Sequence, residues 1–267
     1  MTNGVRQGSI LSPLLFNVFI DGLSSELNGL TVGCYMNNTC FNHLNYADDS
    51  VLLAPTPLAL QKLIDVCYAY SLKYEMLYNV KKTRCIAFKC TGIGDIFLPK
   101  MYLGSEMLKW IDTHTYLGAV LESNCKDNLD IFRQIKSIYA RGNGLIHKFS
   151  KCSEEAKVEL FRAYCSNFYL CQLWCNYNVS TYRKLKVAYN NVFRALLNVN
   201  RRDSVSEAFV RTNCDCFNVT IRKSVYNFYS RIMASGNSLV STILSSIYFT
   251  SRSKLFEEWN SLLFIYN

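Results

Sequence analysis

The sequence contains few histidines, no long uninterrupted apolar run and no secretory pattern at its start. Three histidines, His43, His114 and His147, occur in 267 residues. No apolar run reaches the roughly 18 residues of a membrane-spanning helix, so no membrane partner is expected. Met1–Arg6 lacks a basic segment followed by an apolar one. Secretion is therefore not expected, and an intracellular location, in the nucleus or the cytoplasm, is predicted.

The cysteines lack the spacing of a structural zinc site. Twelve are present; Cys171 and Cys175 are separated by three residues, and Cys214 and Cys216 by one. Zinc modules pair one CxxC with another, or with two spaced histidines. A zinc knuckle is therefore not predicted, and the scattered positions argue against a disulfide framework. We interpret the cysteines as reduced, mostly buried thiols of an intracellular protein.

The composition predicts a folded, basic protein. Half of the residues are hydrophobic, which is enough to bury a core in one or two domains. Lysine and arginine number 29 against 20 acidic residues, a formal net charge of +9. Such a balance suits a polyanionic partner such as nucleic acid. The 18 tyrosines and 16 phenylalanines could supply a few stacking contacts to bases, but most are expected in the core.

Two adjacent carboxylates stand in an apolar stretch. Asp48 and Asp49 lie within Asn45–Ala54 (NYADDSVLLA), after a strand-like segment and before the β-prone run Ser50–Ala54. The pattern predicts a β-hairpin with the acids at its turn. Because adjacent like charges repel, a bound divalent cation would offset them, and Mg²⁺ prefers such oxygen ligands. The alternative is a solvated turn, in which aspartate is common.

Four segments in order resemble the reverse transcriptases of non-LTR (LINE-type) retrotransposons. Gly4–Leu23 is similar to the family motif QGxxLSPxLF, and Tyr46–Asp49 (YADD) resembles the catalytic hairpin. Asn79–Phe88 resembles the motif that follows, and Tyr116–Gly118 the primer grip. The shared order and compatible spacing make this resemblance more specific than any one motif. It weakens after residue 124, where it depends on helical periodicity.

The resemblance implies a site of template-directed nucleotidyl transfer. Asp48 and Asp49 would be catalytic and would hold Mg²⁺ or Mn²⁺, and Lys82 would lie near the leaving pyrophosphate. Without the neighbouring motifs, Lys82 would be interpreted as part of a solvated basic turn. The implied partners are an RNA template, a DNA primer paired with it, and a dNTP. The remaining implied contacts, for nucleotide or template and for the primer grip, are Arg6, Gln7, Gly8, Ser9, Tyr46, Ala47, Asn79, Tyr116, Leu117 and Gly118.

The resemblance also implies a further metal-binding carboxylate, on a strand that precedes Gly4–Leu23 in the family. This sequence shows no counterpart, and Asp21 is not expected to replace it. We therefore expect a fragment of a reverse transcriptase, with a complete metal site only in a longer protein and no competence for polymerisation alone. Two alternatives stay open: a non-catalytic nucleic-acid-binding relic, and a domesticated transposon-derived protein.

The predicted fold is α+β in two parts. Residues 1–123 are expected to form an incomplete polymerase palm, an antiparallel sheet backed by helices, and residues 124–267 an all-helical thumb-like region. Expected in the palm are a helix from Ser12 with Leu14, Leu15, Val18, Phe19 and Leu23 in the core, a helix over Leu58–Leu77, and strands at Cys85–Phe88, Gly92–Leu98 and Tyr116–Leu121. Later helices are expected from Ser153 and over Ser180–Asn200, Ser224–Met233 and Lys254–Leu263.

Overall fold

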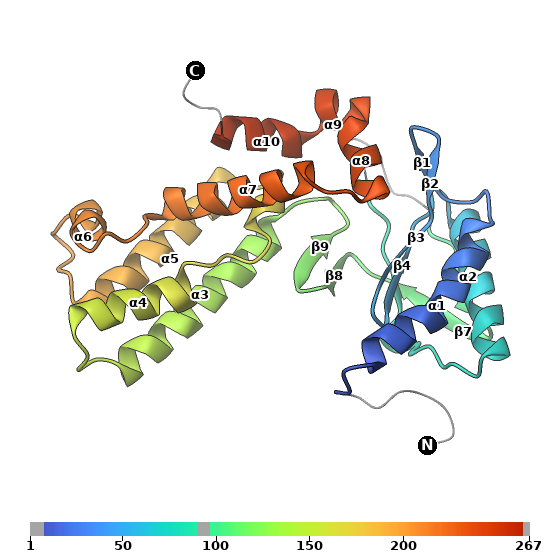
Figure 1. The fold of residues 1–267 in the computed structure, drawn as a ribbon, viewed down its shortest axis with the longest axis horizontal. Helices are drawn as coiled ribbons and strands as arrows, with labels where there is room; N and C mark the ends of the chain where they lie inside the picture. The colour runs from blue at the N-terminus through green and yellow to red at the C-terminus, as the bar shows by residue number, and fades with distance from the viewer. Residues whose placement is uncertain (1–7, 90–96, 264–267) are drawn as a thin grey trace. The chain divides into compact units, whose positions relative to one another are not determined.

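A computed structural model describes residues 8–89 and 97–263 and divides into two compact units (Figure 1). Unit 1 comprises Met1–Ala87 and Gly92–Ile111, and unit 2 comprises Phe88–Thr91 and Asp112–Asn267. The division lies earlier in the chain than the predicted boundary at residue 123. It does so because a short hairpin after residue 112 packs with the helices that follow it. The mixed α and β architecture, with small sheets followed by helices, is confirmed.

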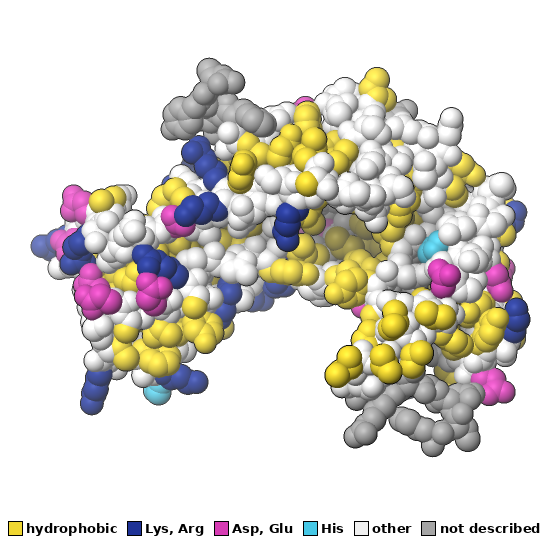
Figure 2. All heavy atoms as spheres, in the orientation of Figure 1, with side chains coloured by type: hydrophobic (Ala, Val, Ile, Leu, Met, Phe, Trp, Pro, Cys, Tyr) yellow, Lys and Arg dark blue, Asp and Glu magenta, His cyan; other side chains and the backbone are white. Residues whose placement is uncertain are grey.

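The first helix of unit 1 buries a different face from the one predicted. Helix α1 runs over Ser12–Asn28 and follows Leu11, so Ser12 is its first residue rather than its N-cap. Its buried residues are Ile20, Leu23 and Leu27. The predicted core positions Leu14, Leu15, Val18 and Phe19 are exposed, so that prediction was wrong except for Leu23. Among the described residues, neighbours cover only the later turns of α1, and hydrophobic side chains stay at the surface here (Figure 2).

Helix α2, Pro57–Lys73, lies against α1 and the strands of unit 1. Thr56 begins it as an N-cap, since its hydroxyl accepts a hydrogen bond from the Ala59 amide at 3.2 Å. The helix buries Leu63, Ile64, Cys67 and Tyr70. It contacts β4 (Asp49–Leu52) and β6 (Met101–Leu103), as expected for a helix packed against the acidic hairpin. It ends at Lys73, before the predicted end at residue 77.

The strands of unit 1 form short ladders. Two antiparallel hairpins follow each other: β1 with β2, and β3 with β4. A third sheet has the order β5-β7-β6, in which β5 pairs parallel with β7 and β6 antiparallel. The bounds not yet given are β1 Cys34–Met36, β2 Thr39–Phe41, β3 His43–Tyr46, β5 Arg84–Cys85 and β7 Glu106–Trp110.

Two predicted strands of this part differ from the structure. A strand was expected over Cys85–Phe88. The observed strand β5 is shorter and begins one residue earlier, because only Arg84 and Cys85 pair with β7. The strand expected over Gly92–Leu98 lies mostly outside the described residues, and its described end, residues 97–98, is not in a strand.

Unit 2 begins with an antiparallel hairpin and continues as helices. Strands β8 and β9 pair around Leu117 and Gly118, so the single strand predicted over Tyr116–Leu121 was wrong: the chain reverses there. After β9 the described residues contain helices and no strand. The elements are β8 Thr113–Tyr116, β9 Ala119–Glu122, α3 Asn128–Lys148, α4 Glu154–Cys165, the 3₁₀ turn η1 Cys171–Leu173, α5 Val179–Leu197, α6 Val205–Arg211, α7 Phe217–Met233, α8 Ser238–Ser245, α9 Ile247–Arg252 and α10 Lys254–Leu263.

Most predicted helix starts in this unit are close to the observed ones, but α7 begins at Phe217 rather than at the predicted Ser224. Ser153 caps α4 by accepting a hydrogen bond from the Ala156 amide at 3.3 Å, as predicted. Glu154 and Glu155 occupy the first turn of α4, where the helix dipole favours negative charge. Helix α10 spans the predicted residues 254–263.

Aromatic side chains fill the core of unit 2. Phe161 packs against Tyr189 and Phe193 with ring centroids 5.0 and 4.9 Å apart. These three residues are fully buried, but other aromatic residues among those described, such as Tyr35, Tyr46 and Tyr226, are exposed. The core therefore holds only part of the aromatic side chains, fewer than predicted. Helices α3 and α5 approach closely at Gly142, where an added Cβ atom would lie 2.3 Å from a methyl carbon of Val192. Glycine is therefore needed there for the two backbones to meet.

Several cysteines belong to these cores and are not reactive. Cys67, Cys85, Cys165, Cys171 and Cys214 are buried free thiols. Burial raises the pKa of Cys165 and of Cys171 to about 11, so both stay protonated near neutral pH.

Not one of the described helices is long and apolar enough to cross a bilayer.

Candidate functional site

The predicted acidic hairpin is present, with its carboxylates at the tip. Strands β3 and β4 pair from His43 opposite Leu52 to Tyr46 opposite Asp49. Ala47 and Asp48 therefore make the two-residue turn, and Asp49 is the first residue of β4. Ala47 adopts φ +52°, a left-handed conformation that costs a non-glycine residue about 1 kcal/mol or more. The tight turn imposes this strain, and Asp48 and Asp49 are adjacent residues at this end of the hairpin.

Both carboxylates are open to solvent and have no countercharge among the described residues. Asp48 and Asp49 are exposed, and neither forms an ion pair with a described lysine or arginine. Tyr46, which precedes the turn, is 64% exposed. The hairpin tip thus presents carboxylate oxygens and an aromatic ring to solvent, a surface suited to a cation and a planar ligand.

Buried polar side chains fix the base of this hairpin on α1. Asn42 is buried, and its side-chain amide donates to the Leu27 carbonyl oxygen at 2.7 Å. The backbone carbonyl oxygen of Asn42 accepts a hydrogen bond from the Leu53 backbone amide at 2.8 Å. Asn45 donates to the Ser24 hydroxyl at 2.9 Å. Sequence analysis missed these anchoring roles; polar residues inside an otherwise β-prone segment were the available signal.

The donor set of the hairpin fits Mg²⁺ or Mn²⁺ only in part. Carboxylate oxygens are the ligands that Mg²⁺ takes from proteins, usually one or two, with water and substrate phosphates completing the shell. Among residues 8–89 and 97–263, no three or more His, Cys, Asp or Glu side chains are gathered closely enough to hold a metal ion. Asp48 and Asp49 could therefore anchor an ion, but they do not form a closed protein cage.

The predicted contacts Asn79 and Lys82 belong to one turn. The Lys82 amide donates to the backbone oxygen of Asn79 at 2.9 Å and to its side-chain oxygen at 3.1 Å. The Thr83 hydroxyl donates to the Asn79 carbonyl at 3.0 Å. Asn79 thus shapes the turn that carries Lys82. The Lys82 side chain is exposed and forms no ion pair with a described carboxylate, so it is available to an anionic ligand.

The predicted nucleotide-contact segment before α1 is described only in part. Arg6 and Gln7 lie outside the described residues. Gly8 has φ +83°, a conformation that favours glycine, and nothing lies within 4 Å of where its Cβ atom would be. Ser9 is exposed, and its carbonyl oxygen accepts from the Ser12 amide at 3.3 Å. This backbone is therefore open to close approach by a ligand.

The predicted primer-grip residues form the tip of the β8–β9 hairpin in unit 2. Leu117 and Gly118 occupy the turn with φ +44° and +80°. The Tyr169 hydroxyl donates to the Leu117 carbonyl at 2.9 Å. An added Cβ atom on Gly118 would lie 3.0 Å from the Tyr169 ring. The turn is thus held against an aromatic side chain, and Tyr116 lies at the end of β8 beside it.

A buried carboxylate connects this hairpin to the helices. Asp130 Oδ1 accepts from the Val120 amide of β9 at 3.1 Å and from Arg133 Nε at 2.8 Å. Its Oδ2 accepts from Trp174 Nε1 at 2.8 Å. Asp130 is 4% exposed. Sequence analysis did not identify Asp130, because an acidic residue near a helix start is usually a solvated dipole partner.

A second aspartate holds the segment before α5. Asp127 Oδ2 accepts from the amides of Cys175 and Asn176 at 2.8 and 2.7 Å. Burial raises the pKa of Asp127, while the two amide donors act in the opposite direction. Asp127 and Asp130 therefore serve the architecture around the β8–β9 hairpin rather than a metal site.

Comparisons with known proteins agree with the motif order. Residues 1–121 match the family described as reverse transcriptase (RNA-dependent DNA polymerase). The chain is 34% identical over 128 residues to the Pol polyprotein of the type-2 retrotransposable element R2DM of Drosophila melanogaster, covering 43% of this chain and 11% of that protein. It is 30% identical over 129 residues to the Pol polyprotein of a type-1 element R2 of Popillia japonica, covering 45% and 21%.

A third relative extends further along the chain. The RNA-directed DNA polymerase from the mobile element jockey of Drosophila funebris is 24% identical over 168 residues, which is 60% of this chain and 18% of that protein. The chain thus spans between about a tenth and about a fifth of the length of these relatives.

Proposed function

We propose that the chain serves RNA-directed DNA synthesis, because residues 1–121 match the reverse transcriptase family and are similar to polymerases of retrotransposable elements. The observation that carries the proposal is the β3–β4 hairpin, which places Asp48 and Asp49 at its exposed tip in the motif of that family. The substrates would be a dNTP and a DNA primer annealed to an RNA template.

Each predicted residue that the structure describes has a proposed role compatible with its position. Asp48, supported by Asp49, would hold Mg²⁺, which when bound supplies charge neutralisation for phosphoryl transfer. Lys82, exposed on the turn shaped by Asn79, would contact the leaving phosphates. The open backbone at Gly8 and Ser9 would admit the nucleotide. Tyr46 and Ala47 would contact the nucleotide or template, as would Arg6 and Gln7, and the Tyr116–Gly118 turn would contact the primer strand.

Binding to an RNA–DNA hybrid is the first expected result. Lysine and arginine side chains are spread over the visible face of the helical unit (Figure 2), and the chain carries a formal charge of +9. Fluorescence anisotropy with a labelled hybrid should show affinity that falls roughly tenfold or more between about 50 and 200 mM salt, because phosphate contacts release counterions. A flat salt response would contradict nucleic-acid binding.

We further propose that these 267 residues do not polymerise by themselves. The described residues contain no cluster of three or more metal-ligating side chains, whereas transfer by two metal ions needs carboxylates from more than one place in a fold. In a primer-extension assay with an RNA template and Mg²⁺, the chain alone should give no product that depends on Asp48. Robust synthesis that Asp48→Asn abolishes would contradict this proposal.

The same observation favours a second candidate function. A chain with a partial metal site and a basic helical unit could act as a nucleic-acid-binding protein without catalysis. In that case hybrid binding would be retained, and it would not depend on Asp48. Its location, nucleus or cytoplasm, stays a prediction.

A further inference from the structure

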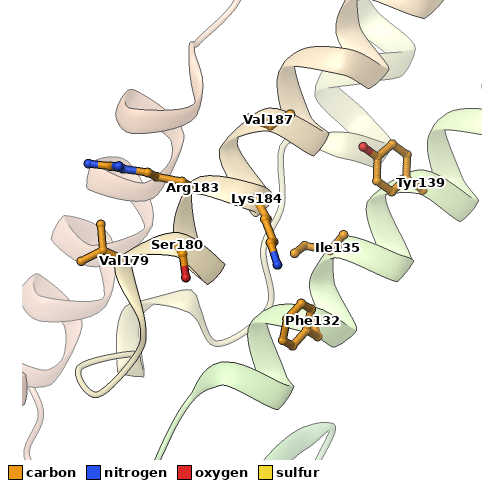
Figure 3. A pocket seen from close by; sticks show the side chains of 8 residues that line it. All are labelled: Phe132, Ile135, Tyr139, Val179, Ser180, Arg183, Lys184 and Val187. Atoms are coloured by element: carbon orange, nitrogen blue, oxygen red, sulfur yellow. The ribbon is translucent and has the colours of Figure 1, made fainter.

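A groove on the surface of unit 2 has no role in the proposed reaction. It lies between α3 and α5 and has a volume of about 490 Å³ (Figure 3). Its lining side chains come from these two helices and are mostly apolar: Phe132, Ile135, Tyr139, Val179, Ser180, Arg183, Lys184 and Val187. We propose that this groove binds an acidic amphipathic helix of a protein partner, with the apolar face of that helix in the groove.

The solvent-exposed surface of the groove is apolar, whereas the exposed face of a pair of packed helices in a soluble protein is ordinarily polar. Val179, Val187 and Tyr139 are 61%, 53% and 37% exposed. On α3 the lining residues 132, 135 and 139 recur at helical spacing, and on α5 residues 179, 183 and 187 do the same. The α3 row is apolar, and the α5 row has valines on either side of Arg183; neighbouring rows with apolar members on two packed helices can form a groove that receives a third helix.

The dimensions suit a short helix. The α5 side of the groove runs from Val179 to Val187, which is about 12 Å along a helix axis, or roughly two turns. Helices α3, α4 and α5 already pack on one another, and the exposure of Val179 and Val187 shows that the described residues leave this side of α5 uncovered. A partner helix seated there would extend the bundle.

The charges of the groove select an acidic partner. Lys184 points into the groove with its ammonium 5.7 Å from the centre of the Phe132 ring, whereas Arg183 extends away from the α3 side chains (Figure 3). Neither forms an ion pair with a described carboxylate, and no acidic side chain lines the groove. A glutamate beside the apolar face of a partner helix would meet the Lys184 ammonium.

The lining favours a protein helix over single-stranded nucleic acid. Nucleic acid without sequence preference uses exposed aromatic faces in succession. Here Lys184 lies over Phe132, Tyr139 is the other aromatic residue of the lining, and the remaining apolar surface is aliphatic. Aliphatic side chains fill space against leucine or isoleucine but offer no stacking surface.

The test uses a labelled synthetic peptide of roughly 18 residues, about five helical turns, with leucines at helical spacing on one face and glutamates beside them. Fluorescence anisotropy should show binding by the full chain. Lys184→Glu should weaken this binding about tenfold, and Val187→Asp should do the same by placing a charge in the apolar floor. Both side chains are exposed, and circular dichroism melting will confirm that the variants fold.

Lys186→Glu is the matched control, because Lys186 is exposed on the same helix but does not line the groove. It should leave peptide affinity within about twofold of wild type. A peptide with the same composition in scrambled order should not bind. Absence of binding by the amphipathic peptide would overturn the proposal, as would equal effects of Lys184→Glu and Lys186→Glu. The proposal would also be overturned if an oligodeoxythymidine displaced the peptide and Lys184→Glu selectively weakened binding of that oligonucleotide. That result would assign the groove to nucleic acid.

Discussion

Replacing Asp130 with alanine is expected to lower the free energy of unfolding of the helical unit by about 3 kcal/mol. The carboxylate is 4% exposed and accepts from three donors, on Val120, Arg133 and Trp174. Its removal leaves the buried indole N–H of Trp174 and the β9 amide without their acceptor. It also leaves the guanidinium of Arg133, which has one buried nitrogen without a partner already, without its countercharge.

Urea unfolding followed by circular dichroism measures this effect. Asp215→Ala is the matched control, because Asp215 forms an exposed ion pair with Lys223 at 2.5 Å, with side chains 40% and 62% exposed. Exposed pairs of this type contribute less than about 1 kcal/mol. If Asp130→Ala destabilises the chain no more than Asp215→Ala, the carboxylate does not connect the β8–β9 hairpin to the helices.

Local sequence patterns correctly predicted those turns, caps and helices whose formation depends mainly on residues close to them in the sequence. The acidic turn at Asp48 followed from two β-prone runs around polar residues, and it is present. Ser153 caps its helix as its position before an acidic first turn indicated. Helix α10 has the predicted bounds because its apolar positions recur at helical spacing over its whole length.

Features that depend on distant contacts could not be predicted in the same way. The apolar stripe of α1 gave no information about which of its turns would be covered, and Leu14 and Val18 are exposed. Asp130 bonds to Trp174, 44 positions away along the chain, and no local pattern pairs them. Gly142 is required only because Val192 lies against it.

One error had a signal that was available. The segment Tyr116–Leu121 was predicted as a single strand, but Gly118 in its middle is a residue that favours a turn. The structure reverses the chain there, with Leu117 and Gly118 both at positive φ. Of the predicted primer-grip residues, Leu117 and Gly118 therefore lie in the turn and are exposed, and Tyr116 is the last residue of β8.

Replacing Asp48 or Asp49 with asparagine is expected to weaken divalent-metal binding at the hairpin by tenfold or more. The two carboxylates are adjacent on the β3–β4 turn and exposed, and each neutral amide removes one charged ligand from a site that has few. Changes merely adjacent to metal ligands already cost about 10- to 100-fold in affinity, so loss of a direct ligand should cost at least as much.

The proposal that the β3–β4 hairpin holds a divalent metal ion is tested most directly with Mn²⁺. As paramagnetic Mn²⁺ is added to the isotope-labelled full chain, NMR should show broadening of the backbone amide signals of Ala47 and Ser50 before those of other exposed segments. Asp48→Asn should abolish this selective broadening, whereas Asp21→Asn, a control at an exposed carboxylate on α1, should leave it unchanged. Broadening that persists in Asp48→Asn, or that Asp21→Asn reduces equally, would contradict the assignment.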